Sequence, residues 1–245
     1  DFTGNDKYFQ ANSFQPSQDR PYVEKMVKYL QSDHQYLQCS CEDQADLLED
    51  SVKAHDLPAM ADVDSSMLYF CRIVSKQHKV VLTGECADEV FGGYPWFHRE
   101  EFLKGGTFPW TPTLDPRKNL LSKELRELLR MEEYVQDTYN RALMDITPLP
   151  EENETETNRR QIGYLNIRFF MQTLLTRMDR TSMYSGLEAR VPFADPKLVS
   201  YVYNIPWNMK AKDGLVKNIL RQAAKGLLPD EILFRRKSPY PKSYN

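Results

Sequence analysis

The feature that most constrains the fold is a short β-branched run between two segments of different character. Residues 79–84 read KVVLTG, so glycine ends the run. Residues 62–75 before it carry apolar side chains at helical spacing, and an acidic segment follows it. An apolar run of this length beside helices is typical of a strand buried on both faces of a parallel sheet. We therefore predict an α/β fold.

The rest of the chain is predicted to be mostly helical. Gly105-Gly106 and several prolines mark a loop near residues 105–116, and acidic residues 151–157 are predicted to be a solvated connector. A short strand is expected at residues 34–39. The coarse division is an α/β portion at residues 1–100, built on a partial parallel sheet, and a largely helical lobe at residues 101–245. Apolar periodicity predicts helices at residues 21–31, 43–54, 62–75, 122–144, 158–182, 195–203 and 215–225.

Composition excludes several classes of protein. The 245 residues are 41% hydrophobic and 27% charged with a net charge of −3, a soluble globular balance that favours neither nucleic acid nor an anionic membrane as a partner. No apolar run approaches the ~20 residues that span a bilayer. The chain has neither a secretory signal nor an initiator methionine, so we interpret it as trimmed. Four scattered cysteines are too few for a disulfide framework, which favours a reducing, cytoplasmic location.

Polar chemistry gathers where the predicted strand ends. Ligands of open α/β sheets bind at the carboxyl ends of the strands, and Thr83 and Gly84 lie at such an end. Three carboxylates follow at once, Glu85, Asp88 and Glu89. Carboxylates beside phosphates are expected where Mg²⁺ bridges them. Acidic residues that only complement a helix dipole, worth about 0.3–1 kcal/mol, explain the spacing equally well.

Three ordered motifs resemble one known family. Residues 83–94, TGECADEVFGGY, resemble the S-G-E-G-[SA]-D-E-[VIL]-F-G-G-Y signature of glutamine-dependent asparagine synthetases. Residues 177–183 (RMDRTSM) and 187–195 (LEARVPFAD) are similar to the family's R-x-D-R-x-S-M…EARVPFLD. Residues 227–232 (LLPDEI) and 235–237 (RRK) are similar to its L-L-P-x-x-I…R-x-K. The resemblance covers about 160 residues, and it identifies residues 1–245 as a fragment of an asparagine-synthetase-like domain.

The resemblance implies a reaction and a set of roles. The family's synthetase domain resembles other pyrophosphate-releasing ATPases. With ATP and Mg²⁺, this domain activates aspartate as an acyl-adenylate, and ammonia from glutamine then displaces AMP. Matching positions imply that Thr83, Gly84 and Asp88 bind the nucleotide and that Asp88 holds the metal. They also imply Glu85 as general base, Lys237 as the cation that stabilises phosphate charge and Arg177 as a substrate-binding residue. A homodimer of the parent enzyme is left open.

Each of these roles has a simpler alternative. Lys237 lies in a basic triplet that, by itself, is more often a solvated turn. Glu188 and Arg190 are interpreted as a buried pair that braces the helical lobe rather than contacting substrate. Arg180 is assigned either to capping or to local pairing. The segment Asp64-Ser65-Ser66 echoes a phosphate loop, but it lacks the loop's glycines and is predicted to be helical.

The sequence also departs from the family. The S-G-G-x-D-S phosphate loop and the N-terminal glutaminase domain are absent from the sequence, so we expect the isolated chain to be inactive. Thr83 replaces the usual serine, and Cys86 adds a side chain where glycine usually keeps the backbone free. Two other functions remain open. One is a β-lactam-synthetase-like enzyme that cyclises its own substrate, and the other is a non-catalytic paralogue that serves as a binding module.

Overall fold

The computed structural model describes residues 2–12 and 15–238 and divides the chain into two compact units. The first comprises residues 1–84, 174–192 and 220–245, and the second comprises residues 85–173 and 193–219. Chain order and compact units therefore differ, because each unit is assembled from segments distant in sequence. The division at residue 100 stays a prediction about domains.

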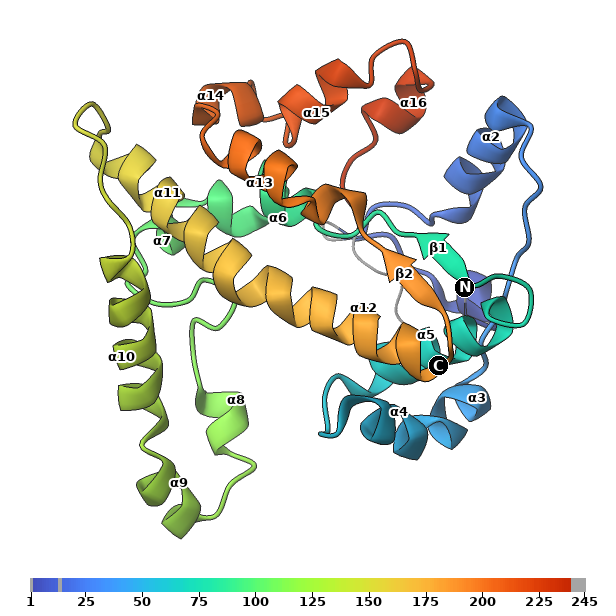
Figure 1. The fold of residues 1–245 in the computed structure, drawn as a ribbon, viewed down its shortest axis with the longest axis horizontal. Helices are drawn as coiled ribbons and strands as arrows, with labels where there is room; N and C mark the ends of the chain where they lie inside the picture. The colour runs from blue at the N-terminus through green and yellow to red at the C-terminus, as the bar shows by residue number, and fades with distance from the viewer. Residues whose placement is uncertain (1, 13–14, 239–245) are drawn as a thin grey trace. The chain divides into compact units, whose positions relative to one another are not determined.

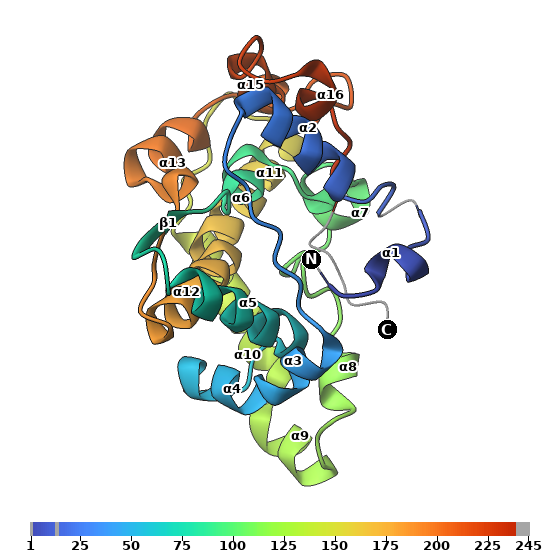
Figure 2. The same cartoon turned by 90° about the vertical axis from the view of Figure 1, so that its right-hand side faces the viewer.

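The first unit is built around a small parallel sheet and α5. Strand β1 (Val80–Leu82) pairs in parallel with β2 (Glu188–Arg190), with Val81 opposite Ala189. Helices α3 and α4 lie beside α5 (Figure 2). The helices that lie wholly in this unit are α1 (Asn5–Tyr8), α2 (Arg20–Leu30), α3 (Cys41–Asp46), α4 (Leu48–His55), α5 (Ala61–Val74) and α16 (Asp230–Leu233).

The core of this unit joins α5 to the sheet. Met67 and Cys71 of α5 pack with Leu187, which directly precedes β2. Val81 of β1, Met178 of α12 (Gln172–Tyr184) and two further valines of α5 also pack against this cluster. Because Val81 alternates with Val80 and Leu82 along the strand, the two flanking side chains face the other way and are 41% and 73% exposed. The predicted strand and its parallel pairing are confirmed, but burial on both faces is wrong, since within the described residues α5 covers a single face.

The second unit is helical. Helices α10 and α11 pack against each other (Figure 1) around Phe108, Ala142 and Leu165. Its elements are α6 (Ala87–Phe91), η1 (Pro95–Phe97), α7 (Glu100–Leu103), α8 (Asp115–Lys118), α9 (Lys123–Leu129), α10 (Met131–Met144), α11 (Glu154–Leu165), the π-helical turn η2 (Asn166–Met171), α13 (Pro196–Tyr203) and α14 (Trp207–Lys210). Three further elements, α12 (Gln172–Tyr184), η3 (Pro192–Ala194) and α15 (Asn218–Ala223), cross the unit boundaries. An α/β fold with a helical lobe is thus confirmed.

Several predicted helices are interrupted where the backbone changes conformation. The expected helix at residues 122–144 breaks at Arg130, whose φ is 46°, and that at residues 43–54 breaks at Leu47. The long helix predicted at residues 158–182 forms as α11, η2 and α12 in unbroken succession. It begins earlier than expected, because the Asn153 side chain accepts a hydrogen bond from Glu156 N and caps α11 inside the predicted connector.

Two predictions about local structure in the first unit have different outcomes. The strand expected at residues 34–39 is reduced to an isolated bridge between Phe2 and Cys39. The segment Asp64-Ser65-Ser66 lies within α5, which confirms the predicted helix, and it is almost fully buried. Across the described part of the chain, every helix is too short or too polar to cross a membrane.

Candidate functional site

The signature run folds as a strand, a loop and a short helix. After β1, the Thr83 amide donates to the carbonyl oxygen of Arg190 at 2.9 Å, which extends the pairing with β2 by one residue. The run then leaves the first unit after Gly84, and α6 begins at Ala87 in the second. The strand thus ends before Gly84, as the sequence predicted, and a short loop joins it to α6.

Cys86 has the conformation that glycine usually supplies. Its φ is 69°, in the left-handed region, and its side chain is 1% exposed. Burial, followed by the charges of Glu89 and Glu85, raises the pKa of the thiol to about 12. The thiol is therefore protonated and shielded, and Cys86 fills space instead of acting as a nucleophile. All four cysteines lie in the described ranges, and none of them forms a disulfide there.

The two glycines after α6 have separate steric reasons. Gly92 ends the helix with φ at 72°, and a Cβ there would lie 2.5 Å from a ring carbon of Trp207. A Cβ on Gly93 would lie 1.8 Å from the Asp88 carboxylate. The Gly93 amide also donates to the Asp88 carbonyl oxygen at 2.8 Å. Gly93 therefore leaves the space that the Asp88 side chain occupies.

Asp88 forms the central ion pair of this part of the signature. Lys217 Nζ lies 3.0 Å from Asp88 Oδ1, and the two side chains are about one-fifth exposed. Lys217 has φ at 56° and directly precedes α15, so a left-handed residue at the end of a loop directs this cation. A carboxylate and an ammonium held this closely, and partly shielded from water, form a polar centre that can bind a phosphate and its counterion.

Glu89 anchors α6 to the helical core of the second unit. The Tyr94 hydroxyl donates to Glu89 Oε1 at 2.5 Å, and Asn166 Nδ2 donates to the Glu89 carbonyl oxygen at 3.2 Å. Glu89 is 3% exposed and Asn166 is fully buried within η2. Burial first, and then the Glu89 charge, raises the pKa of the Tyr94 phenol. Glu89 thus braces the helix, whereas Glu85 is half-buried in the loop ahead of it.

The other predicted site residues belong to the first unit. Thr83 Oγ1 is buried and has no hydrogen-bond partner within the described ranges, so its hydroxyl is available to a ligand. Gly84 is exposed, and a Cβ there would meet nothing within 4 Å. Arg177 is half-buried on α12, and Lys237 is half-buried near the end of the described chain. Glu85 and Asp88 belong to the second unit.

The simpler alternatives have mixed outcomes. Arg180 acts as a cap and does not pair locally: Nη1 donates to the His55 carbonyl oxygen at 2.5 Å and to Asp56 Oδ2 at 3.0 Å, at the end of the sequence-distant α4. Glu188 and Arg190 do form an ion pair at 2.8 Å, but the prediction that it is buried is wrong. The residues are two apart on β2 and share its exposed face, so the pair contributes little to stability.

The basic triplet at residues 235–237 is more than a solvated turn. Arg235 Nη2 lies 2.5 Å from Asp19 Oδ1, and the guanidinium sits 4.0 Å from the centre of the Tyr22 ring. Arg221 Nη2 donates to the Arg235 carbonyl oxygen at 3.3 Å. The backbone just before Lys237 is therefore fixed by two arginines, a role that no local sequence pattern signals.

A metal ion could be held only in a particular way here. Within the described ranges, no three His, Cys, Asp or Glu side chains gather into a ready-made metal site. Mg²⁺ usually binds through one or two carboxylates and completes its shell with phosphate oxygens and water. Asp88 can supply one such carboxylate, so the residues present fit a metal that arrives with a phosphate.

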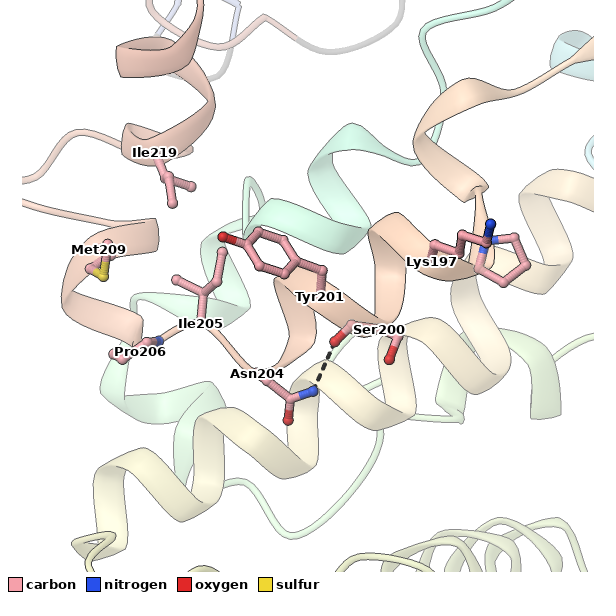
Figure 3. A pocket seen from close by; sticks show the side chains of 9 residues that line it. Lys197, Ser200, Tyr201, Asn204, Ile205, Pro206, Met209 and Ile219 are labelled. Carbon is pink, nitrogen blue, oxygen red and sulfur yellow. Dashed lines mark hydrogen bonds between the residues drawn. The ribbon is translucent and has the colours of Figure 1, made fainter.

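A hollow elsewhere in the second unit contains none of the predicted residues. It encloses about 810 Å³ and is open to solvent along α13 and α14. Tyr201, Ile205, Met209 and Ile219 supply apolar surface, and Asn204 Nδ2 donates to the Ser200 carbonyl oxygen at 2.8 Å (Figure 3). Convergent charged groups are lacking among its described lining residues apart from Lys197, so this groove is not the candidate active site.

Comparisons with known proteins agree with the signature. Residues 7–245 match the family model described as asparagine synthase. The chain belongs to the asparagine synthase family. Glutamine-hydrolysing asparagine synthetase 3 of Bacillus subtilis strain 168 is 50% identical over 245 residues, which is all of this chain and 40% of that relative.

More distant relatives carry similar names. Glutamine-hydrolysing asparagine synthetase 1 of the same strain is 29% identical over 74% of this chain and 34% of its own length. The glutamine-hydrolysing asparagine synthetase of Rattus norvegicus is 25% identical over 94% of this chain and 33% of its own length. The chain thus spans 40% or less of the curated relatives described here.

Proposed function

We propose that the protein containing this chain makes asparagine. ATP activates the side-chain carboxylate of aspartate as an acyl-adenylate with release of pyrophosphate, and ammonia from glutamine then displaces AMP. Membership of the asparagine synthase family supports this, as do relatives named for glutamine-dependent asparagine synthesis. The observation that carries the proposal is the Asp88–Lys217 pair at the start of α6, inside the signature run.

The nucleotide would be bound by the beginning of the signature. Thr83 offers a buried hydroxyl without a partner in the described ranges, and Gly84 offers backbone with open space around its Cα. Asp88 would hold Mg²⁺ together with the pyrophosphate, where the metal supplies positive charge against the phosphate oxygens. Lys217 now balances the Asp88 carboxylate, and it would be able to turn to a phosphate oxygen if Asp88 held the metal.

The remaining residues would act on the acyl group. Glu85 would remove a proton from the attacking ammonia, and for that it must be ionised and within hydrogen-bonding distance of the nitrogen. Lys237 would stabilise the charge that grows on the phosphates during adenylation. Arg177 would bind a carboxylate of aspartate through two parallel N–H donors. The lack of a disulfide among the four cysteines of the described chain supports a reducing, cytoplasmic location.

Pyrophosphate release tests the substrate. The assay uses the gene product that contains this chain, with ATP, Mg²⁺ and either aspartate or another amino acid. We expect release that depends on aspartate and forms asparagine when ammonia is supplied. Greater release with another carboxylic acid would replace aspartate as the substrate, and release with none of them would favour a non-catalytic binding module.

A matched pair of variants tests the base. Glu85→Gln keeps the size of the side chain and removes its charge, so we expect asparagine formation from ammonia to fall at least 100-fold. Pyrophosphate release, which precedes the ammonia step, should fall much less. Glu101→Gln alters an exposed glutamate of the same unit and should leave both rates unchanged. Wild-type asparagine formation by Glu85→Gln would refute the assignment.

A further inference from the structure

A cavity in the second unit borders α6 and has no role in the proposed reaction. It encloses about 510 Å³, and Glu89, Val90 and Gly92 of the α6 region form part of its wall. We call it the Lys210 cavity, after the buried lysine that lines it. Arg159, Arg160 and Trp207 also line it. Three cations at one cavity are unusual beside so much apolar surface.

Lys210 is the least solvated of these cations. Its side chain belongs to the last residue of α14 and is 9% exposed. Nζ donates to the Tyr203 carbonyl oxygen at 3.2 Å, and in the described part of the chain no carboxylate lies within 4 Å of it. Burial, and then the nearby Arg160, lowers its pKa to about 8. A buried ammonium with a single neutral acceptor is an expensive arrangement that an anion would relieve.

Arg159 is the second cation without a carboxylate partner among the described residues. Its Nε donates to the Phe97 carbonyl oxygen at 3.4 Å, and its guanidinium lies 5.0 Å from the centre of the Trp207 ring. Burial lowers the pKa of its guanidinium although the Glu156 charge opposes this. The guanidinium therefore keeps donors that a ligand can use.

Three of the four acidic groups at the cavity already have a hydrogen-bond or ion-pair partner. Glu152 pairs with Arg160, whose Nε lies 2.7 Å from Glu152 Oε1. Glu156 accepts a hydrogen bond from the Asn153 amide at 3.3 Å, and Glu89 accepts from Tyr94. The fourth, Glu151, is exposed. Within the described residues, none of these carboxylates forms an ion pair with Lys210 or Arg159, although the Glu156 charge acts on Arg159 from a distance.

The apolar part of the wall selects among anions. Trp207 stacks on Phe97 with ring centres 5.5 Å apart, and Ile167 also lines the cavity. An inorganic anion would use the cations but would leave this surface without a contact. A carboxylate attached to an aromatic or aliphatic body would use both.

We propose that the Lys210 cavity binds a small organic carboxylate, with its carboxylate on Lys210 and Arg159 and its apolar body against Trp207. This site is separate from the proposed nucleotide residues and does not depend on the proposed reaction.

Benzoate is a suitable probe because it joins one carboxylate to one aromatic ring. Calorimetric titration of the chain with benzoate should show saturable binding. Bound benzoate should also quench tryptophan fluorescence, since Trp207 lines the cavity. Benzyl alcohol has the ring without the charge and should not bind. Failure of benzoate to bind, or equal binding of inorganic phosphate, would overturn the proposal.

Two pairs of variants locate the site. Lys210→Met should weaken benzoate binding at least tenfold, whereas Lys212→Met alters an exposed lysine two residues further along the chain and should not. If Lys210→Met does not fold, Arg159→Gln replaces it, with the exposed Arg168→Gln as its control. Both Lys210→Met and Arg159→Gln binding benzoate as the wild type does would refute the assignment.

Discussion

Gly92 is a position in the signature where a single methyl group should both strain the backbone and clash with a packed aromatic ring. Its φ of 72° requires the left-handed region, which costs an alanine roughly 1–2 kcal/mol. The new Cβ would also lie 2.5 Å and 2.8 Å from two carbons of the Trp207 ring. That ring stacks on Phe97 and contacts Arg159, so it cannot move without disturbing both. Overpacking of this kind costs about 1–3 kcal/mol.

Two other glycines allow the backbone cost to be measured apart from the overpacking cost. Gly106 and Gly214 have φ of 64° and 75°, but a Cβ on either would meet nothing within 4 Å. Gly106→Ala and Gly214→Ala should therefore show only the backbone cost of roughly 1–2 kcal/mol. Gly92→Ala should lose roughly 2–5 kcal/mol, the sum of the two terms.

Urea unfolding followed by tryptophan fluorescence measures this difference directly. All three tryptophans lie in the second unit together with these three glycines, so the signal reports on the unit that is perturbed. We predict from this clash that the free energy of unfolding falls further for Gly92→Ala than for either control. Equal losses in the three variants would show that Trp207 does not restrict this position and would refute it.

Three further predictions concern groups outside that turn. Arg235→Met should lower the free energy of unfolding by about 1–3 kcal/mol, because it removes the contacts with Asp19 and Tyr22. Arg236 is exposed, so Arg236→Met should be neutral, and equal urea midpoints of the two variants would contradict this. The pKa of Lys210 falls from its usual 10.5 to about 8 on folding, so the unfolded chain binds more protons between these values and stability should rise with pH there. Lys210→Met should remove that rise and be the more stable form at pH 7, by on the order of 3 kcal/mol at ~1.4 kcal/mol per pKa unit; identical stability–pH profiles of variant and wild type would refute it. Iodoacetamide at pH 8 should alkylate exposed Cys41 in the native chain and reach Cys86, with its pKa of about 12, only after unfolding, as peptide mass spectrometry can verify.

Local patterns predicted the parts of the fold that depend on neighbouring residues. The apolar stripes at residues 21–31 and 62–75 correspond to α2 and α5, because the spacing of a helix is a property of a few turns. The strand before Gly84 was also predicted from a local pattern, a short β-branched run that ends at glycine. Cys86 was expected to place a side chain where glycine usually leaves the backbone free. Its φ of 69° agrees, because this left-handed conformation is one that favours glycine. Capping was harder to predict, since Asn153 begins α11 inside a stretch that is polar enough to be a connector.

The sequence by itself determined the family and nominated Glu85 and Asp88, because the signature is a contiguous run whose residue types and spacing are specific. Tertiary structure alone decided what surrounds them. Lys217 reaches Asp88 from a distant loop, Trp207 explains Gly92, and Arg235 fixes the segment before Lys237 by pairing with Asp19. It also decided that Val80 and Leu82 are exposed, although their apolar character predicted burial. Such contacts join residues far apart in the chain, and packing in three dimensions sets them.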